Sequence, residues 1–433
     1  MLERSFAVPD DRQDNMSDSP FASIEAAIED YRAGKMVVIV DDEDRENEGD
    51  VCVAAELVTA EQVTFMAIEA RGLICLTLSP ERIEQLELPL QNASNKAGFE
   101  TAFTVTIEAA EGVTTGISAE DRAHTIRVAA KADAKPSDLD RPGHVFPLRA
   151  KANGVLERTG QTEASVDMAK LAGLEPASVI CEVMNDDGTM ARVPDLVEFC
   201  AKHDLKMIMI KDLVEYRRRT ELHLERTASA ALPTRHGDFE VVGYRATVDG
   251  LEHVALVKGD VKGAKDVLVR VHSSCATGDI FHSLRCDCGE QLERALEDIE
   301  AAGQGVLVYL AQEGRGIGLV EKLRAYELQQ NGHDTVDANL ELGHEVDSRE
   351  FHAAAHVLRD LGVVSVKLLT NNPRKVEELE LYGVPVTERV QHEVASSDSN
   401  RSYLRTKRDR LGHLLEDAAL SNGEVREPTL LAR

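Results

Sequence analysis

The chain contains no tryptophan, few other aromatic residues and no long apolar run. Only 4% of its 433 residues are aromatic, so it has few side chains on which the bases of single-stranded nucleic acid could stack. No apolar run approaches the roughly 18 residues that a membrane-spanning helix needs. The first residues also lack the apolar core of a secretory signal. We therefore expect neither nucleic acid nor a membrane as a partner.

Basic residues are outnumbered as well. Lys and Arg total 49 against 77 Asp and Glu, which gives a net charge of −28. Such a surface repels nucleic acid and anionic membranes, so a phosphorylated ligand must be held by local basic groups. The seven cysteines form an odd set in a long chain without a signal sequence, which indicates a reducing location and favours the cytoplasm.

The length of the chain favours two domains. Short apolar runs typical of strands, such as residues 36–40 and 305–310, alternate with helical patterns such as 164–171 and 320–330. This alternation predicts an α/β (α+β) fold in both halves, with two consecutive mixed-sheet domains and helices packed on the sheets. The predicted division is a disordered extension at 1–18, a first domain at 19–217, a linker at 218–231, a second domain at 232–415 and a flexible tail at 416–433. The linker is placed where the sequence becomes charged and then rich in small residues, up to Pro233.

An acidic segment directly follows the predicted strand at residues 36–40. Seven of the ten residues in DDEDRENEGD (41–50) are carboxylates. Carboxylates packed together raise one another's pKa unless a cation neutralises them, and oxygen ligands suit Mg²⁺ or Mn²⁺. A solvated acidic turn is the alternative interpretation.

Two further segments of the first half carry basic and hydroxyl side chains. RPGHVFPLRA (141–150) places Arg141, His144 and Arg149 among Pro and Gly, which predicts a loop. RTGQTEASVD (158–167) stands just before a predicted helix, and a helix N-terminus with Gly and hydroxyl groups can bind phosphate. The first half thus combines candidate metal ligands with candidate phosphate contacts.

These motifs, with GVTTGISAEDRAHTIR (112–127) and CEVMNDDGTMAR (181–192), resemble those of 3,4-dihydroxy-2-butanone-4-phosphate synthase. The resemblance covers about residues 20–217 and implies conversion of ribulose 5-phosphate, with loss of formate. It implies that Glu46 binds Mg²⁺ or Mn²⁺ and that His144 and Glu182 are catalytic. The positions that it assigns to ribulose 5-phosphate are Arg45, Glu46, Asp50, Arg158, Thr159, Gly160, Gln161 and Thr162. Gln161 differs from the family, which has histidine here as a second metal ligand.

Three cysteines cluster in the second half. Cys275 is separated from Cys286 by ten residues and Cys286 from Cys288 by one. A closed structural zinc site takes four ligands, whereas three thiolates and a water form an open, catalytic one. Free thiols are one alternative. A nucleic-acid-binding zinc ribbon is another, but it lacks a fourth nearby cysteine and a positive charge.

The cysteine cluster occurs with LPTRHGDF (232–239), QEGRGIGL (312–319), DSREF (347–351) and TNNPRKVEEL (370–379). Together they resemble GTP cyclohydrolase II over about residues 230–415. The resemblance implies zinc on Cys275, Cys286 and Cys288, Asp347 as proton acceptor and Arg349 as nucleophile, although a guanidinium is nearly always protonated and can instead be a phosphate clamp. The implied GTP contacts are Arg270, His272, Ser273, Gln291, Glu313, Gly314, Arg315, Thr335, Thr370 and Lys375.

The resemblances together predict a bifunctional enzyme of riboflavin biosynthesis, with lyase and hydrolase activities, expected to be a homodimer. Its second product would be 2,5-diamino-6-ribosylamino-4(3H)-pyrimidinone 5′-phosphate, released with formate and pyrophosphate. One alternative keeps only the GTP cyclohydrolase II activity, with an inactive first half, because of Gln161. Another is a zinc-bearing GTP-binding regulator, suggested by Ser274 where the family has glutamate.

Overall fold

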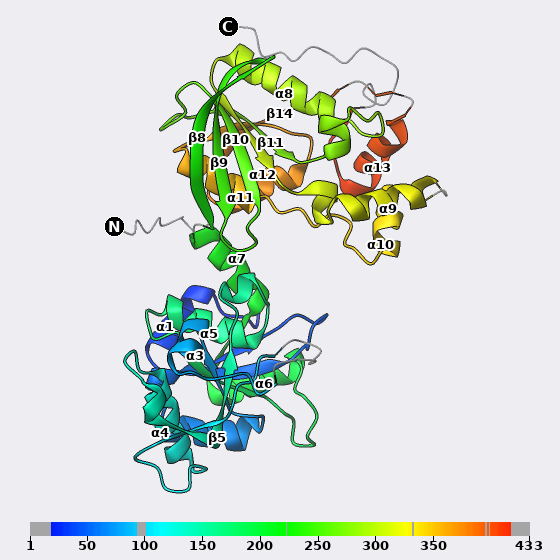
Figure 1. The fold of residues 1–433 in the computed structure, drawn as a ribbon. Helices are drawn as coiled ribbons and strands as arrows, with labels where there is room; N and C mark the ends of the chain where they lie inside the picture. The colour runs from blue at the N-terminus through cyan, green and yellow to red at the C-terminus, as the bar shows by residue number, and fades with distance from the viewer. Residues whose placement is uncertain are drawn as a thin grey trace. The chain divides into compact units, whose positions relative to one another are not determined.

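The computed structural model describes residues 19–92, 101–221, 223–330, 333–394, 396–397 and 399–416. The chain divides into two compact units, Met1–Arg217 and Arg218–Arg433, each built on a seven-stranded sheet (Figure 1). The predicted fold class is confirmed. None of the helices in the described part of the chain is both long and apolar enough to cross a membrane.

The sheet of the first unit has the strand order β4-β5-β3-β6-β2-β1-β7 and mixes parallel with antiparallel pairs. Its strands are β1 (Val37–Val40), β2 (Gly49–Ala54), β3 (Cys75–Leu78), β4 (Ile107–Ala109), β5 (Leu139–Arg149), β6 (Ala177–Glu182) and β7 (Lys206–Met209). The α-helices are α1 (Ile24–Arg32), α2 (Ala60–Phe65), α3 (Pro80–Gln85), α4 (Ala119–Ala130), α5 (Gln161–Leu171), α6 (Val193–His203) and α7 (Ile210–Thr220).

The two faces of this sheet bury different apolar sets. Alternate residues of a strand point to opposite faces, so Val38 of β1 packs with α4 and α6 side chains while Ile39 packs with α1 and α5 side chains. The four residues of β1 are fully buried, as expected for a β-branched strand covered on both faces. Local caps fix the helix starts: Ser23 accepts a hydrogen bond from the amide of Ala26 at 3.2 Å, as an N-cap does.

The sheet of the second unit has the order β14-β13-β11-β12-β10-β9-β8. Its strands are β8 (Leu224–Thr234), β9 (Gly237–Ala246), β10 (Glu252–Lys258), β11 (Val267–Ser273), β12 (Gly305–Leu310), β13 (Val366–Leu369) and β14 (Val386–Val390). The α-helices are α8 (Cys288–Ala302), α9 (Leu319–Gln330), α10 (Thr335–Glu341), α11 (His352–Asp360), α12 (Pro373–Leu381) and α13 (Arg401–Leu411). Strand β11 runs parallel to both β12 and β13, and such strands carry sites beyond their carboxyl ends.

Two sequence-based expectations differ from the structure. Residues 141–149 belong to strand β5 and not to a loop. The apolar residues Leu139, Val145 and Leu148 of this strand are buried in the sheet, although Pro142 and Gly143 lie between the first two of them. In the predicted linker, residues 218–220 continue α7 and residues 224–231 lie in β8, which pairs with β9 along its length. The predicted disordered extension, and the predicted tail beyond Glu416, lie outside the described residues.

Candidate active sites

The strand register of the first unit brings three predicted site residues to one end of the sheet. Asp50 of β2 is paired with Glu182 of β6, and Cys75 of β3 is paired with both Ile180 and Phe146. His144 precedes Phe146 in β5 by two residues and Glu182 follows Ile180 in β6 by two, so both lie at the same end of the sheet. The amide of Leu73 donates to Glu182 Oε2 at 2.8 Å. Because alternate residues share a face, Asp50 and Glu182 lie on the same face as Cys52 and Ile180, which α5 covers.

The acidic loop and the start of α5 meet at Arg45. Its guanidinium donates to Asp41 Oδ2 at 2.6 Å and to the Gln161 side-chain oxygen at 3.0 Å, and it lies 3.1 Å from Glu46 Oε1. Gln161 is the first residue of α5 and is buried. Arg45 thus stands between Glu46 and Gln161, the two positions that the family resemblance assigns to a divalent metal.

Burial and like charges dominate the electrostatics of this site. Burial raises the pKa of Asp50 well above its usual range, and the carboxylates of Glu182 and Glu48 raise it further. Burial also raises the pKa of Glu48, with Glu46 adding to the effect. A divalent cation would relieve this accumulation of negative charge, and Glu46 and Gln161 offer it oxygen ligands. It would have to displace the contacts that Arg45 makes with both.

Of the remaining predicted residues of the first site, two contact the carboxylates of glutamate side chains and the others lie in or next to the turn before α5. His144 Nδ1 lies 2.6 Å from Glu108 Oε2, and Arg158 lies 2.5 Å from Glu163 Oε2. A Cβ at Gly160 would approach Arg158 Nη1 to 2.2 Å, so a larger residue here would displace the Arg158 guanidinium from its place beside Glu163. Thr159 directly precedes Gly160, and Thr162 is buried in the first turn of α5.

The three predicted zinc ligands come together beyond the end of β11. Cys275 follows this strand, and Cys286 and Cys288 lie at the start of α8. Their sulfur atoms all lie within 4.8 Å of one another, and they form the single group of three or more potential metal ligands among the described residues. A Cβ at Gly278 would come within 2.9 Å of Cys286 Sγ, so a glycine lets the backbone wrap closely around the thiols. Three converging thiols fit the open zinc site that the spacing predicted.

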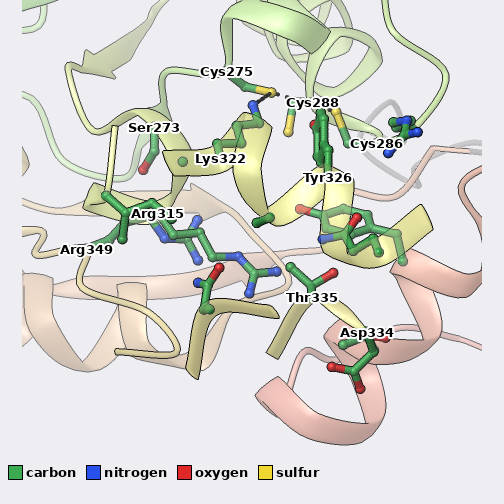
Figure 2. Close-up of a pocket in the computed structure, with 18 of the residues that line it drawn as sticks. Ser273, Cys275, Cys286, Cys288, Arg315, Lys322, Tyr326, Asp334, Thr335 and Arg349 are labelled. Atoms are coloured by element: carbon green, nitrogen blue, oxygen red, sulfur yellow. Dashed lines mark hydrogen bonds between the residues drawn. The ribbon is translucent and has the colours of Figure 1, made fainter. Parts of the chain in front are cut away.

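Charged groups surround the sulfur cluster. Lys322 Nζ of α9 donates to Cys275 Sγ at 3.1 Å (Figure 2). It also donates to Glu313 Oε1 at 2.8 Å. Hydrogen bonding with the neighbouring thiols lowers the pKa of Cys275 far below its usual value despite burial, and Lys322 acts in the same direction. On the other side, Asp279 Oδ2 accepts from the Cys275 amide at 2.9 Å, and Asp279 Oδ1 lies 3.1 Å from His272 Nε2.

A cavity of about 510 Å³ opens beside the cysteines (Figure 2). A smaller cavity of about 60 Å³ adjoins it, and the two share Ser273, Cys288, Arg349 and Tyr403. The predicted GTP-contact residues in the walls of the larger cavity are Ser273, Gly314, Arg315 and Thr335. Those in the walls of the smaller one are Arg270, His272, Ser273, Gln291, Thr370 and Lys375. The side chain of Glu313 accepts hydrogen bonds from Lys322 Nζ and from the amide of Ala276.

Buried cations line the smaller cavity. Arg270 donates to Gln291 at 2.6 Å and to the Leu369 carbonyl at 2.8 Å, while its buried Nε has no hydrogen-bond partner among the described residues. Burial lowers the pKa of Lys375 well below its usual range, and Arg270 and Arg349 add to the effect. Such a concentration of buried positive charge favours an anionic ligand.

Arg315 and Arg349 face the larger cavity from two adjacent segments. Arg315 adopts a φ of +62°, which is uncommon outside glycine, and its buried Nη1 has no partner among the described residues. Its carbonyl accepts from the amide of Ser348 at 3.1 Å. Arg349 donates two hydrogen bonds to the Asp347 carboxylate, at 2.7 and 2.6 Å.

Sequence reasoning missed several residues of these cavities. Tyr326 and Lys322 of α9 line the larger cavity, and Lys407 of α13 lines the smaller one. Tyr403 of α13 lines both. Helix α13 has no motif whose chemistry pointed to this site.

Comparison with known proteins agrees with this division into two sites. Residues 25–216 match the family model described as 3,4-dihydroxy-2-butanone 4-phosphate synthase, and residues 225–391 match GTP cyclohydrolase II. The riboflavin biosynthesis protein RibBA of Salinispora tropica is 57% identical over 91% of this chain and 99% of its own length. RibBA of Aquifex aeolicus is also 57% identical, over 91% of this chain and 98% of its own. The chain belongs to the family of bifunctional riboflavin biosynthesis proteins.

This membership confirms the predicted enzyme class, with a lyase domain of the synthase family followed by a hydrolase domain of the cyclohydrolase family. A solved structure also resembles the chain: RibBX of A. baumannii, described as a two-domain 3,4-dihydroxy-2-butanone 4-phosphate synthase, is 42% identical. The match covers 85% of this chain and 100% of that one, with a TM-score of 0.62. Membership favours two activities over the alternative of a single one.

Proposed function

We propose that the first domain converts ribulose 5-phosphate to 3,4-dihydroxy-2-butanone 4-phosphate and formate. The proposal is supported by the group of acid–base side chains at one end of the first sheet, where Asp50 and Glu182 are paired on neighbouring strands and His144 lies on β5 at the same end. Enolisation beside a carbonyl needs groups that hold and move protons. We assign this work to His144, which is paired with Glu108 at 2.6 Å, and to Glu182, which accepts a hydrogen bond from the Leu73 amide.

The phosphate of the substrate is assigned to the turn before α5. Arg158 and the residues Thr159, Gly160, Gln161 and Thr162 surround the helix N-terminus, where amide groups favour an anion. Arg45 and Asp50 are proposed as contacts to the sugar. Glu46 would hold Mg²⁺ or Mn²⁺, with Gln161 as an amide-oxygen ligand in place of an imidazole. When bound, the cation would polarise the carbonyl as a Lewis acid.

The second domain, we propose, opens the imidazole ring of GTP and releases formate and pyrophosphate. The observation that carries this proposal is the meeting of three thiols with a cavity of about 510 Å³ and a cluster of buried cations. Cys275, Cys286 and Cys288 would hold zinc, which supplies an acidified water for attack on the ring. The product is 2,5-diamino-6-ribosylamino-4(3H)-pyrimidinone 5′-phosphate.

The arginine and lysine side chains of this site are assigned to the phosphates. Burial would lower the pKa of Arg349, but the two hydrogen bonds to Asp347 raise it. A guanidinium held in this way stays protonated, which supports a role as phosphate clamp rather than nucleophile. Arg315, whose Nη1 lacks a partner among the described residues, and Lys375 complete the charge that stabilises the departing pyrophosphate.

Formate release tests both assignments. The purified protein would be supplied separately with GTP and with ribulose 5-phosphate, in the presence of Mg²⁺ and zinc. Formate from both substrates is expected. Formate from GTP alone would show that the first domain is a scaffold, and formate from neither would refute the proposed functions.

Two broader properties belong to the same proposal. The cysteines of the chain are all free thiols, and a zinc site built on thiolates is best preserved in a reducing compartment, which supports a cytoplasmic location. A homodimer is proposed from the family resemblance alone. Light scattering with size-exclusion chromatography would test it.

A further inference from the structure

Helix α13 closes one side of both cavities in the second domain. Tyr403 and Thr406 line the larger cavity, and Tyr403 and Lys407 line the smaller one. Arg410 ties the far end of α13 to Asp337 of α10, with an Nη1–Oδ1 distance of 2.8 Å. Figure 1 shows α13 next to α10 at this side of the unit. The helix is therefore part of the wall against which a ligand of these cavities would rest.

Lys407 makes a buried ion pair with the segment that carries two of the thiols. Its Nζ lies 2.6 Å from Asp287 Oδ1, and the exposed fractions of the two side chains are 11% and 2%. Asp287 stands between Cys286 and Cys288 in the chain. Its other oxygen accepts from Gln291 Nε2 at 2.6 Å. Both oxygens of this carboxylate are thus held, one by α13 and one by α8.

We propose that Lys407 is a positioning residue for GTP ring opening: through Asp287 it fixes the backbone that carries Cys286 and Cys288. This inference rests on the function proposed for the second domain. Residues that hold metal ligands from outside set the orientation of those ligands and tune the metal. The short Cys-Asp-Cys segment makes the effect direct, because a shift of the Asp287 side chain moves the residues that carry two of the three sulfur atoms.

Tyr403 connects this ion pair to the cavity. Its ring centroid lies 4.7 Å from Lys407 Nζ and 5.8 Å from the guanidinium carbon of Arg315. Cations over an aromatic face are attracted by the ring, so Tyr403 helps to keep both at their places. Lys407 therefore couples the position of α13 to the cysteine segment and to a wall of the nucleotide cavity.

The test compares Lys407→Met, which keeps the length of the side chain but removes its charge, with Lys407→Arg and with Arg405→Met. Arg405 is an exposed arginine of the same helix, so it controls for altering the charge of α13. Zinc affinity would be measured by competition with a chromophoric chelator, and the kcat and KM for formate release from GTP would be measured on zinc-loaded protein. Formate release from ribulose 5-phosphate by the same samples reports on the integrity of the chain.

The Met variant should lose about tenfold or more in zinc affinity or in kcat, the range typical of residues that support metal ligands, with a smaller change in KM. Lys407→Arg should recover part of the loss, and Arg405→Met should behave as the unsubstituted protein. Unchanged zinc affinity together with unchanged kcat in Lys407→Met overturns the proposal. If that variant does not fold, Asp287→Asn should give the same signature, and a normal zinc affinity and kcat there would overturn it.

Failure of the proposed function gives a different result. If the unsubstituted protein binds zinc but releases no formate from GTP, the proposed reaction is wrong. The zinc affinities of the variants then still decide whether Lys407 holds the cysteine segment.

Discussion

Arg349, which lines both cavities of the second domain, forms a two-pronged ion pair with Asp347, with distances of 2.7 Å from Nε to Oδ1 and 2.6 Å from Nη2 to Oδ2. Burial would raise the pKa of Asp347, but the hydrogen bonds and the charge of Arg349 lower it to about 2. At neutral pH the pair is fully charged. Asp347 aligns the guanidinium, and it would accept a proton only with this pair disrupted.

Replacing Asp347 by Asn should therefore impair both stability and GTP turnover. The substitution leaves Arg349 buried without its counter-charge, which typically costs about 3–5 kcal/mol. Because the folded pKa lies below the ordinary value of 3.8, the stabilisation by this pair is complete above about pH 4 and is lost as the pH falls towards 2. Thermal unfolding of the second domain between pH 2 and 7 would measure it.

The unsubstituted protein should lose its stability advantage over the Asn variant as the pH falls from about 4 towards 2, so the two proteins should converge at low pH. An equal difference at all pH values would contradict the assignment. Arg374→Met is a suitable control, because Arg374 also lies near Asp347, at 3.7 Å, but is far more exposed. It should change stability by less than about 1 kcal/mol.

Cys286→Ser should abolish both zinc retention and formate release from GTP. A zinc site loses affinity when a thiolate is replaced by a hydroxyl, which is a poorer ligand for zinc. Zinc content by elemental analysis and formate release would be measured together. Cys200→Ser is the matched control, since Cys200 lies in the first unit and is absent from the sulfur cluster. Ring opening by zinc-free Cys286→Ser would contradict the assignment.

Much of this arrangement was predictable from sequence because it depends on local patterns. The β-branched run of β1 and the cysteine spacing each specify an element or a site without distant partners. Strand β5 was not predictable, since Pro142 and Gly143 resemble a loop and the strand forms only through its pairing with β3 and β4. Lys407 was missed for the same reason: its partner Asp287 is 120 residues away in the chain, and a lone lysine on a basic helix gives no signal.

Gln161→His should change the metal dependence of the first domain. In the protein, the Gln161 oxygen accepts from Arg45 at 3.0 Å, and an amide is a weaker ligand for Mn²⁺ than an imidazole. A neutral histidine offers a ring nitrogen to the metal and should lower the Mn²⁺ concentration needed for half-maximal formate release from ribulose 5-phosphate, by about tenfold. Gln161→Ala, which removes the ligand, should raise that concentration. Identical metal dependence in all three proteins would show that residue 161 does not contact the metal.

Asp50→Asn should stabilise the metal-free first domain while reducing its activity. Burial and the neighbouring Glu182 raise the pKa of Asp50 well above its ordinary value of 3.8. A carboxyl whose pKa is higher in the folded than in the unfolded state does not destabilise the fold at low pH, where it is protonated in both states. As the pH rises from the unfolded-state pKa towards the folded-state pKa, the loss of folding free energy grows. The Asn variant should therefore melt at a higher temperature than the unsubstituted protein in EDTA at pH 7, and the difference should shrink towards pH 4.

Asp44→Asn, at an exposed position of the same loop, should show neither effect. A lower melting temperature for Asp50→Asn at pH 7 would mean that the ionised carboxylate is stabilised by a partner, and the electrostatic account of this site would then be wrong.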